Sequence, residues 1–465
     1  MLSLCQLDRH YGRREFLRIG GLALGGLSLG DLLAAPSSAA PPGKLVTDKS
    51  VIFLFLHGGP SQFETFDPKM SAPAEVRSAT GELATRIPGV TFGGTFPRLA
   101  GLADKLAIVR SFTTGDANHD IKPVVCRDTL GANIGSLYSR VAGTNHPATG
   151  LPTNVALYPQ AVDTEALPAV KGFGDFEATG ALGKSVAPFV PGAKGELQQA
   201  MRLNLPLTRL DDRREVLRRL DRIRWAADAN GLLEGLDGMR EQAFRVILGG
   251  VADAFDLKRE RPETLARYDT STLVRPDAIS KRWNNHKNYR DHTQTLGKLL
   301  LLARRLCEVG CGFVTVTTSF VWDMHADVNN AGVDEGMGYM GVPLDYALAA
   351  LIDDLESRGL GERILVVVCG EMGRTPRINA RGGRDHWGNL APLLLYGGGL
   401  PKGQVIGQST RNGGEPLTEP VRIKNLLGTI MQTLLHTGEV RVTRGVPSEL
   451  NRLLAEAEPI PGLAS

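Results

Sequence analysis

GFVTVTT at residues 312–318 and ILVVVC at residues 364–369 are two continuous apolar runs of strand length. Such runs are typical of strands that are buried on both faces of a parallel sheet. Helical periodicity precedes each run, and we expect helices at 293–309 and 343–358, the second with Pro343 in its first turn. This alternation of helix and strand predicts an α/β fold with a mostly parallel central sheet.

Three other apolar runs extend the expected sheet: VIFLFL at 51–56, LAIV at 106–109 and LLLY at 393–396. Residues 147–195 are rich in Gly, Pro and Ala and show little periodicity, which indicates long loops over the sheet. An amphipathic helix is expected at 421–436, where apolar residues recur on one face.

The segment from about residue 207 to residue 290 is charged and leucine-rich, which predicts a helical insertion in the domain. Within it, residues 213–224 combine an apolar helical stripe with many arginines. Such a basic face either binds an anionic partner or is a solvated surface neutralised by acidic neighbours. The interleaved acidic residues favour the solvated surface.

The first 39 residues have the features of a targeting segment. Arg13 and Arg14 form a twin-arginine signature, a glycine-rich apolar stretch follows at 19–33, and small residues stand at 37–39. We therefore expect a signal peptide over 1–39, read by the twin-arginine translocase, and a periplasmic or extracellular mature protein with a single domain over 40–465. A retained anchor is the alternative, but the stretch is too short and too glycine-rich for a stable membrane span.

Composition excludes some classes of function. The formal net charge is only +3 at pH 7, which provides no electrostatic footprint for nucleic acid. The chain has five cysteines, too few for a disulfide framework in an exported protein of this size, although one bridge remains open. The pair Cys307 and Cys311 lacks the spacing of a zinc motif and is interpreted as packing.

Polar side chains follow the apolar runs, where parallel strands place their carboxyl ends at one edge of the sheet. Asp323 and His325 are two residues apart, so in extended chain both point to the same side. Oxygen and imidazole donors of this kind suit a divalent cation such as Zn or Mn. The candidate metal ligands are His57, Asp323, His325, Glu371, Asp385 and His386.

A second group of residues has the chemistry of catalysis. Ser61 follows two glycines and is a candidate nucleophile, or alternatively the cap of a helix. Arg110 and His119 belong to one polar loop, which offers contacts to an oxyanion and, in the imidazole of His119, one good metal ligand. We expect Arg374 and Arg384 to bind the oxygens of an anionic substrate, unless they only form ion pairs with the neighbouring carboxylates.

Six segments together resemble one known family, domain-of-unknown-function family 1501. They are the twin-arginine start, LHGGPSQFETFDPK at 56–69, the loop at 110–119, WDMH at 322–325, GEMGRTPRIN at 370–379 and GRDHWGN at 383–389. This family is grouped with the alkaline-phosphatase-like superfamily. The resemblance implies a three-layer α/β fold and hydrolysis of sulfate or phosphate esters at one or two metal ions, with Ca joining Zn and Mn.

By this resemblance, Asp323 and His325 look like the superfamily's Asp and His from one loop, and His386 is similar to its last metal-binding His. Glu371 stands where the superfamily has an Asp. His57 departs from the pattern, since a carboxylate is expected there. The implied function is an exported metal-dependent hydrolase whose substrate is an anionic ester, such as a sulfated or phosphorylated carbohydrate. The alternative is a non-catalytic member of the fold that binds a glycan or a partner protein.

Overall fold

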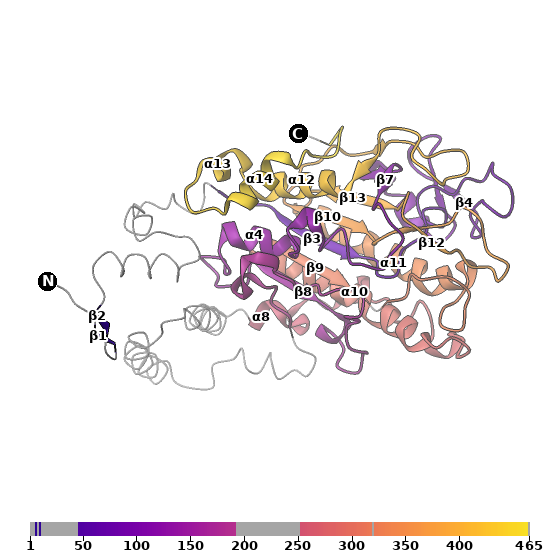
Figure 1. Ribbon diagram of the computed structural model, residues 1–465. Helices are drawn as coiled ribbons and strands as arrows, with labels where there is room; N and C mark the ends of the chain where they lie inside the picture. The colour runs from indigo at the N-terminus through magenta and orange to yellow at the C-terminus, as the bar shows by residue number, and fades with distance from the viewer. Residues whose placement is uncertain (1–4, 7–8, 11–44, 192–251, 319, 464–465) are drawn as a thin grey trace.

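A seven-stranded sheet lies at the centre of the computed structural model, which describes residues 5–6, 9–10, 45–191, 252–318 and 320–463 (Figure 1). Its strands, in order across the sheet, are β14 (Gln404–Ile406), β6 (Leu106–Val109), β13 (Leu393–Gly397), β10 (Ile364–Cys369), β3 (Ser50–Phe55), β9 (Phe313–Thr317) and β8 (Asn154–Leu157). Strands β10, β3, β9 and β8 are parallel neighbours, as are β14 and β6. Only β13 runs antiparallel to its two neighbours. The predicted α/β fold with a mostly parallel sheet is therefore confirmed.

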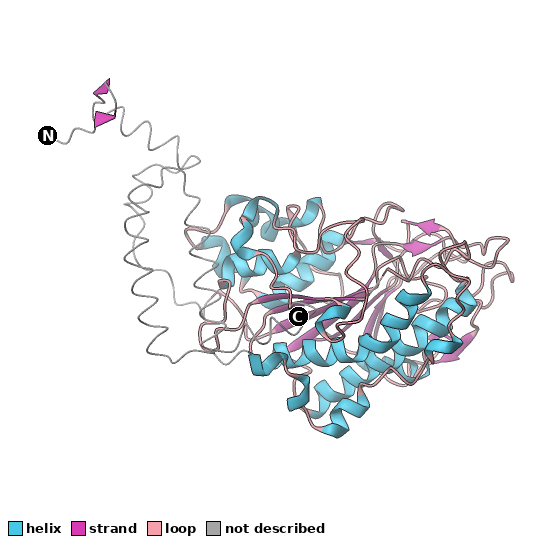
Figure 2. Cartoon of the chain, turned by 90° about the horizontal axis from the view of Figure 1, so that it is seen from below, coloured by secondary structure: helices cyan, strands magenta, loops and turns pink. Residues whose placement is uncertain are grey.

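Helices cover both faces of this sheet, because the strand side chains are apolar on both sides (Figure 2). In β3, Ile52 and Leu54 pack with the helices α10 (His286–Glu308) and α11 (Val333–Ser357). The alternate residues Val51, Phe53 and Phe55 belong to the opposite core, together with residues of α4 (Ile134–Ala142), α12 (Ile423–Leu434) and α14 (Ser448–Glu456). Because side chains alternate between the two faces of each strand, the sheet is covered on both sides and the three layers implied by the family resemblance are present.

Two predicted helix starts were wrong. Helix α10 begins at His286, seven residues before its expected start at 293. Helix α11 begins at Val333, so Pro343 lies inside the helix and not in its first turn. Three glycines in the first ten residues hid this part of the helix from propensity reasoning. Two of them serve close packing, because a Cβ added at Gly336 would lie 2.9 Å from the Met324 sulfur and one at Gly341 would lie 2.6 Å from Oγ1 of Thr95.

Several elements were not expected from the sequence. Strand β8 lies within the region 147–195 that was interpreted as loops, and α4 has no counterpart among the predictions.

The remaining helices of the described residues are α3 (Pro97–Ala100), α8 (Ala252–Phe255), α9 (Pro262–Arg267) and α13 (Thr437–Val442). Two-stranded sheets pair β1 (Cys5–Gln6) with β2 (Arg9–His10), β4 (Glu82–Ala84) with β5 (Thr91–Gly93), β7 (Phe112–Thr113) with β15 (Val421–Arg422), and β11 (Gly373–Arg374) with β12 (His386–Trp387). Short 3-10 helices lie at Ala103–Lys105, Arg127–Thr129, Pro159–Ala161, Gly180–Leu182, Lys184–Val186, Leu257–Arg259 and Pro276–Ala278.

Two of the sequence predictions lie largely outside the described residues. The structure describes almost none of the expected signal peptide over 1–39 and none of the arginine-rich helix expected at 213–224. Of the expected insertion at about 207–290, the part from 252 onward is described and contains α8, α9 and the start of α10. No helix in the described ranges has the combination of length and apolarity needed to cross a membrane. Cys126, Cys307, Cys311 and Cys369 are free thiols.

A buried ion-pair network joins α10 and α11. The Arg304 guanidinium, 1% exposed, lies 3.0 Å from the Asp354 carboxylate through its Nε and also pairs with Glu260. Arg305 and Arg358 contact the same Glu260 carboxylate at 3.2 and 3.3 Å. Burial by itself would raise the pKa of Glu260, but the hydrogen bond and charge of Arg304 outweigh it and lower the pKa from 4.5 to about 2.

We expect Glu260→Gln to lower the free energy of unfolding at pH 7 by about 2 kcal/mol, because it removes the carboxylate that Arg304 shares with Arg305 and Arg358. Arg304 keeps its ion pair with Asp354. A carboxyl whose folded-state pKa is lowered stabilises the protein above its unfolded-state pKa. This contribution should therefore decline as the pH falls from about 4.5 to about 2. The native protein and the variant should have nearly equal free energies of unfolding at about pH 2. Urea unfolding at several pH values measures the difference. Glu263→Gln, on the exposed side of α9, is the matched control, and a gap that persists at pH 2 would contradict the assignment.

Candidate metal centre

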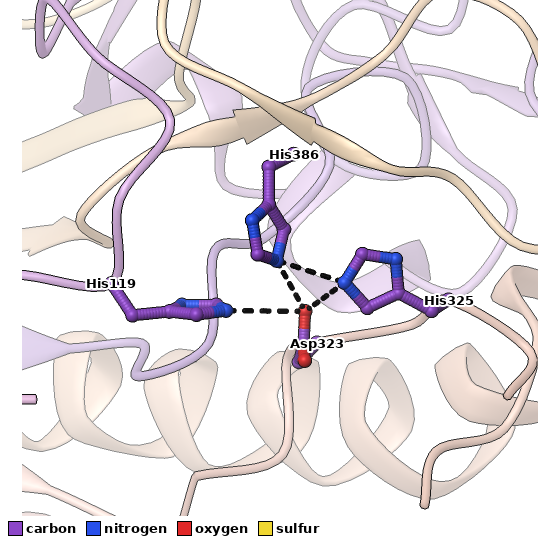
Figure 3. A group of neighbouring side chains, drawn as sticks. All are labelled: His119, Asp323, His325 and His386. Atoms are coloured by element: carbon purple, nitrogen blue, oxygen red, sulfur yellow. Dashed lines mark hydrogen bonds and ion pairs between the residues drawn. The ribbon is translucent and has the colours of Figure 1, made fainter. Parts of the chain in front are cut away.

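Four side chains from three loops converge at one edge of the sheet (Figure 3). Oδ1 of Asp323 lies 2.8 Å from Nε2 of His325, 3.1 Å from Nε2 of His386 and 3.5 Å from Nε2 of His119. The two Nε2 atoms of His325 and His386 are 2.8 Å apart. The prediction that Asp323 and His325 point to the same side is confirmed by this geometry. We refer to His119, Asp323, His325 and His386 as the metal centre.

The donors fit a divalent cation in chemistry and in spacing. Three imidazole nitrogens and one carboxylate oxygen are a donor set that Zn or Mn accepts. Metal–ligand distances of about 2.1 Å in a tetrahedral arrangement place neighbouring donors about 3.4 Å apart. The observed separations from the Asp323 oxygen, 2.8 to 3.5 Å, lie close to this value.

Two further carboxylates lie behind the histidines. Glu371 accepts a hydrogen bond from Nδ1 of His119 at 2.9 Å, and Asp385 accepts one from Nδ1 of His325 at 3.1 Å. Each bond turns the opposite nitrogen, Nε2, toward the centre, which is how metal-binding histidines are commonly oriented. The sequence analysis expected Glu371 and Asp385 to be ligands themselves. The structure places them behind His119 and His325, and His119 joins the group of candidate ligands.

The electrostatics of the centre favour an ionised Asp323. Burial by itself would raise the pKa of this carboxyl, but hydrogen bonds from His119, His325 and His386 and the charge of Arg374 lower the pKa well below its usual range. For His119, burial acts to lower the pKa, and the two carboxylates of Asp323 and Glu371 outweigh it and raise the pKa. Arg374 thus stabilises the one anionic ligand of the centre.

Glycines bring the loops together. Gly58 has φ 117°, and a Cβ there would lie 2.7 Å from the backbone nitrogens of Trp322 and Asp323. Its own N–H donates to the Glu371 carboxylate at 2.9 Å. On the other side, a Cβ at Gly383 would lie 2.1 Å from the carbonyl carbon of His325, so only glycine lets the 383–386 segment approach.

His57 does not belong to the metal centre, in contrast to its expected role as a ligand. Its ring is 1% exposed and lies against Phe55, Phe176 and Phe320 with centroid distances of 5.0 to 5.9 Å. Burial lowers the pKa of His57. Its carbonyl accepts hydrogen bonds from the N–H groups of Val321 and Trp322, both at 3.1 Å. The backbone carbonyl of His57 therefore holds in place the segment that carries Asp323.

The two arginines expected to bind the substrate are fully buried. Arg374 donates to the carbonyls of Gly58, Gly59 and Trp322, and its Nη2 lies 2.7 Å from Asp323. Arg384 pairs with Glu64 at 3.0 Å and donates to four backbone carbonyls, those of Val76, Arg77, Thr375 and Pro376. Arg384 therefore lies apart from the centre and is committed to the fold, which corrects its expected role in an anion pocket.

Ser61 and Arg110 also lie outside the centre. The Ser61 hydroxyl is buried, donates to the Glu64 carboxylate and accepts from the N–H of Phe63 at 3.2 Å. The chain after it forms turns, so neither the expected helix cap nor a solvent-facing nucleophile is present in this conformation. Arg110 donates to the carbonyls of Phe66 and Thr91 at 3.0 and 3.1 Å, and thus supports the neighbouring loops.

We expect Glu371→Gln to weaken metal binding by about tenfold to a hundredfold, because the neutral amide makes His119 a poorer and less well oriented donor. The amide oxygen can still accept from the N–H of Gly58, so the loop should keep its shape. Competition with a chelator measures the affinity. Glu419→Gln, an exposed change outside the metal centre, serves as control, and equal affinity in both variants would contradict the orienting role.

The chain is distantly similar to several solved structures. No curated protein matches the sequence. Among solved structures, a sulfatase from Pseudoalteromonas sp. aligns at 12% identity over 91% of this chain and 72% of its own, with a TM-score of 0.35. A phosphonate monoester hydrolase from Silicibacter pomeroyi aligns at 12% identity over 83% and 73%, with a TM-score of 0.28. Alkaline phosphatase from the Antarctic bacterium TAB5 aligns at 11% identity over 84% and 99%, with a TM-score of 0.26.

The match to a protein family covers far more of the sequence than any single motif. The model of the family described as protein of unknown function (DUF1501) matches residues 48–460, from the start of β3 to the end of the last helix and beyond. All four residues of the metal centre lie within this range, and so do the two orienting carboxylates. The chain belongs to the DUF1501 family.

Proposed function

We propose that this protein is a metal-dependent hydrolase of phosphate or sulfate esters. The observation that carries the proposal is the metal centre, in which three histidines and one aspartate converge and two carboxylates orient two of the histidines. Orienting carboxylates of this kind support catalytic metal sites as well as structural ones. The position of the centre at the carboxyl ends of parallel strands is where α/β enzymes commonly bind their ligands.

The centre is accessible on the side of His386. This side chain is 30% exposed, and Asp385 beside it is 57% exposed, whereas the Asp323 side chain is 10% exposed. A cation such as Mn, which accepts more than four ligands, would leave positions for an ester oxygen or water on this side. When present in this centre, the metal would act as a Lewis acid and would lower the pKa of a water molecule coordinated to it.

Residues around the metal centre orient its candidate ligands and set their charge. Arg374 keeps Asp323 ionised, and Glu371 and Asp385 fix the tautomers of His119 and His325. The net charge of the donor set stays low, since Asp323 is its single carboxylate, so a dianionic or monoanionic ester remains attractive to the loaded centre. We assign no nucleophile among the side chains, because Ser61 is held by Glu64.

The test is hydrolysis of 4-nitrophenyl sulfate and 4-nitrophenyl phosphate by protein loaded with Zn, Mn or Ca. We expect turnover of one ester, abolished by chelation and restored by the metal. Stoichiometric metal without turnover of either ester would instead favour the alternative, a non-catalytic protein that binds a glycan or a partner protein. Sulfated and phosphorylated carbohydrates are the natural esters to test next.

We further propose export to the periplasm or beyond, supported by the twin-arginine signature at the start of the chain. Changing Arg13 and Arg14 to Lys should leave the uncleaved precursor in the cytoplasm, because the translocase reads the arginine pair and not its charge alone. Cell fractionation and immunoblotting measure the distribution. Arg9→Lys, which keeps the pair, is the control, and unchanged export of the double variant would point to another route.

A further inference from the structure

An aromatic wall formed by Phe173 and Phe320 lies beside the metal centre. The two rings stack with centroids 4.6 Å apart and an interplanar angle of 25°. Both rings also contact the imidazole of His119, with centroid distances of 5.0 Å for Phe173 and 4.7 Å for Phe320. The aromatic wall is therefore in direct contact with one of the four residues of the metal centre.

Phe173 differs from its aromatic neighbours in exposure. Phe320 is 9% exposed and Phe176 is 2% exposed, as expected for core residues, whereas Phe173 is 37% exposed. A single exposed Phe on a surface needs no explanation. Its contact with a metal-centre histidine is different, because ligand sites typically combine a few polar groups with an apolar or aromatic lining.

The loop that carries Phe173 is held in place by packing and by hydrogen bonds. Gly174 has φ 142°, and a Cβ there would lie 2.6 Å from the side chain of Ile121, two residues after His119. Phe176 packs edge-on against Phe55 with a centroid distance of 5.2 Å, and its carbonyl accepts from Nδ2 of Asn133 at 2.9 Å. The aromatic wall is thus in place before a ligand arrives, which reduces the entropic cost of binding.

We propose that the aromatic wall binds the organic part of the ester, through the apolar face of a ring, while the anionic group lies at the metal centre. This inference rests on the proposed function. A phenylalanine side chain offers no hydrogen bond, so its selectivity comes from flat apolar contact. An aryl group and the apolar face of a pyranose both present such a surface, whereas a short alkyl group does not.

The experiment measures binding and not turnover. Calorimetry on the metal-loaded protein compares three non-hydrolysable anions, methylphosphonate, phenylphosphonate and a hexopyranosyl phosphonate. We expect at least one ring-bearing phosphonate to bind about threefold to tenfold more tightly than methylphosphonate. Phe173→Ala should abolish this preference and leave the affinity for methylphosphonate unchanged. Whichever ring is preferred identifies the source of the ring in the substrate.

Three variants separate ring contact from general packing. Phe173→Tyr keeps the flat ring and should keep the preference, while Phe173→Leu keeps an apolar side chain and should lose most of it. Val442→Ala, at an exposed apolar residue of α13, should change nothing. Equal binding of all three phosphonates to the native protein would overturn the role of the aromatic wall alone. Failure of the loaded protein to bind any of them would overturn the ester site as well.

Discussion

His325→Ala should remove most of the bound metal. The imidazole of His325 is central to the metal centre, since its Nε2 lies 2.8 Å from both the Asp323 oxygen and Nε2 of His386. Losing one of four donors costs more than losing an orienting carboxylate, so we expect the affinity to fall by more than about a hundredfold. Mass spectrometry of metals on dialysed protein measures the occupancy.

The matched control for this change is His436→Ala, which removes an exposed imidazole that lies just before α13 and outside the metal centre. It should bind metal as the native protein does. His386→Ala should behave like His325→Ala, because its Nε2 lies 3.1 Å from the same Asp323 oxygen. Native occupancy in both His325→Ala and His386→Ala would show that the metal binds elsewhere.

Arg384→Ala should lower the free energy of unfolding by about 3–5 kcal/mol, because it leaves the Glu64 carboxylate buried without its charged partner. Both side chains of this pair are 0% exposed, and the guanidinium also lies 4.3 Å above the ring of Phe63. Arg384→Lys keeps the charge but cannot reach the same set of carbonyls, so it should recover only part of the loss. Urea unfolding measures the change.

Two further variants test whether the loss comes from the unpaired charge. Combining Arg384→Ala with Glu64→Gln removes both charges and should restore part of the stability. Arg381→Ala, in the same loop but exposed, should have little effect. Because Arg384 lies apart from the metal centre, Arg384→Ala that stays folded should bind vanadate as tightly as the native protein. A large loss of vanadate affinity without a loss of stability would contradict this assignment and would support a role for Arg384 in an anion pocket.

The sequence predicted the sheet well because its strands are long apolar runs, which periodicity detects. The runs at 106–109 and 364–369 coincide with β6 and β10. It missed β8, whose four residues lie among glycines and prolines, and the edge strand β14, which has only three residues and no buried side chain. It also misplaced the start of α11, whose glycines pack closely on Met324 and Thr95. Those glycines are required by tertiary contacts, which no local pattern reveals.

The sequence predicted which segments of the chain form the candidate site, but not which of their side chains point into it. The order of residues cannot tell a ligand from a carboxylate that lies behind a ligand, so Glu371 and Asp385 were expected to be ligands although they contact His119 and His325 instead. Buried arginines and substrate-binding arginines also look alike in sequence. Phe173 and Phe320 gave no signal, because they lie far apart in the chain and only the fold stacks them.

The central strand β3 pairs with β9 and β10, which both lie much farther along the chain, and His119 contacts Glu371 across 252 residues of sequence. A nascent chain released before residue 364 can build neither the sheet nor the cluster of donors. The proposed metal centre can therefore form only after most of the polypeptide has been synthesised, and slow maturation is expected of such non-local topology. If the protein crosses the membrane already folded, the ion that it carries is selected by the metal supply of the cytoplasm and not by that of the compartment in which it works.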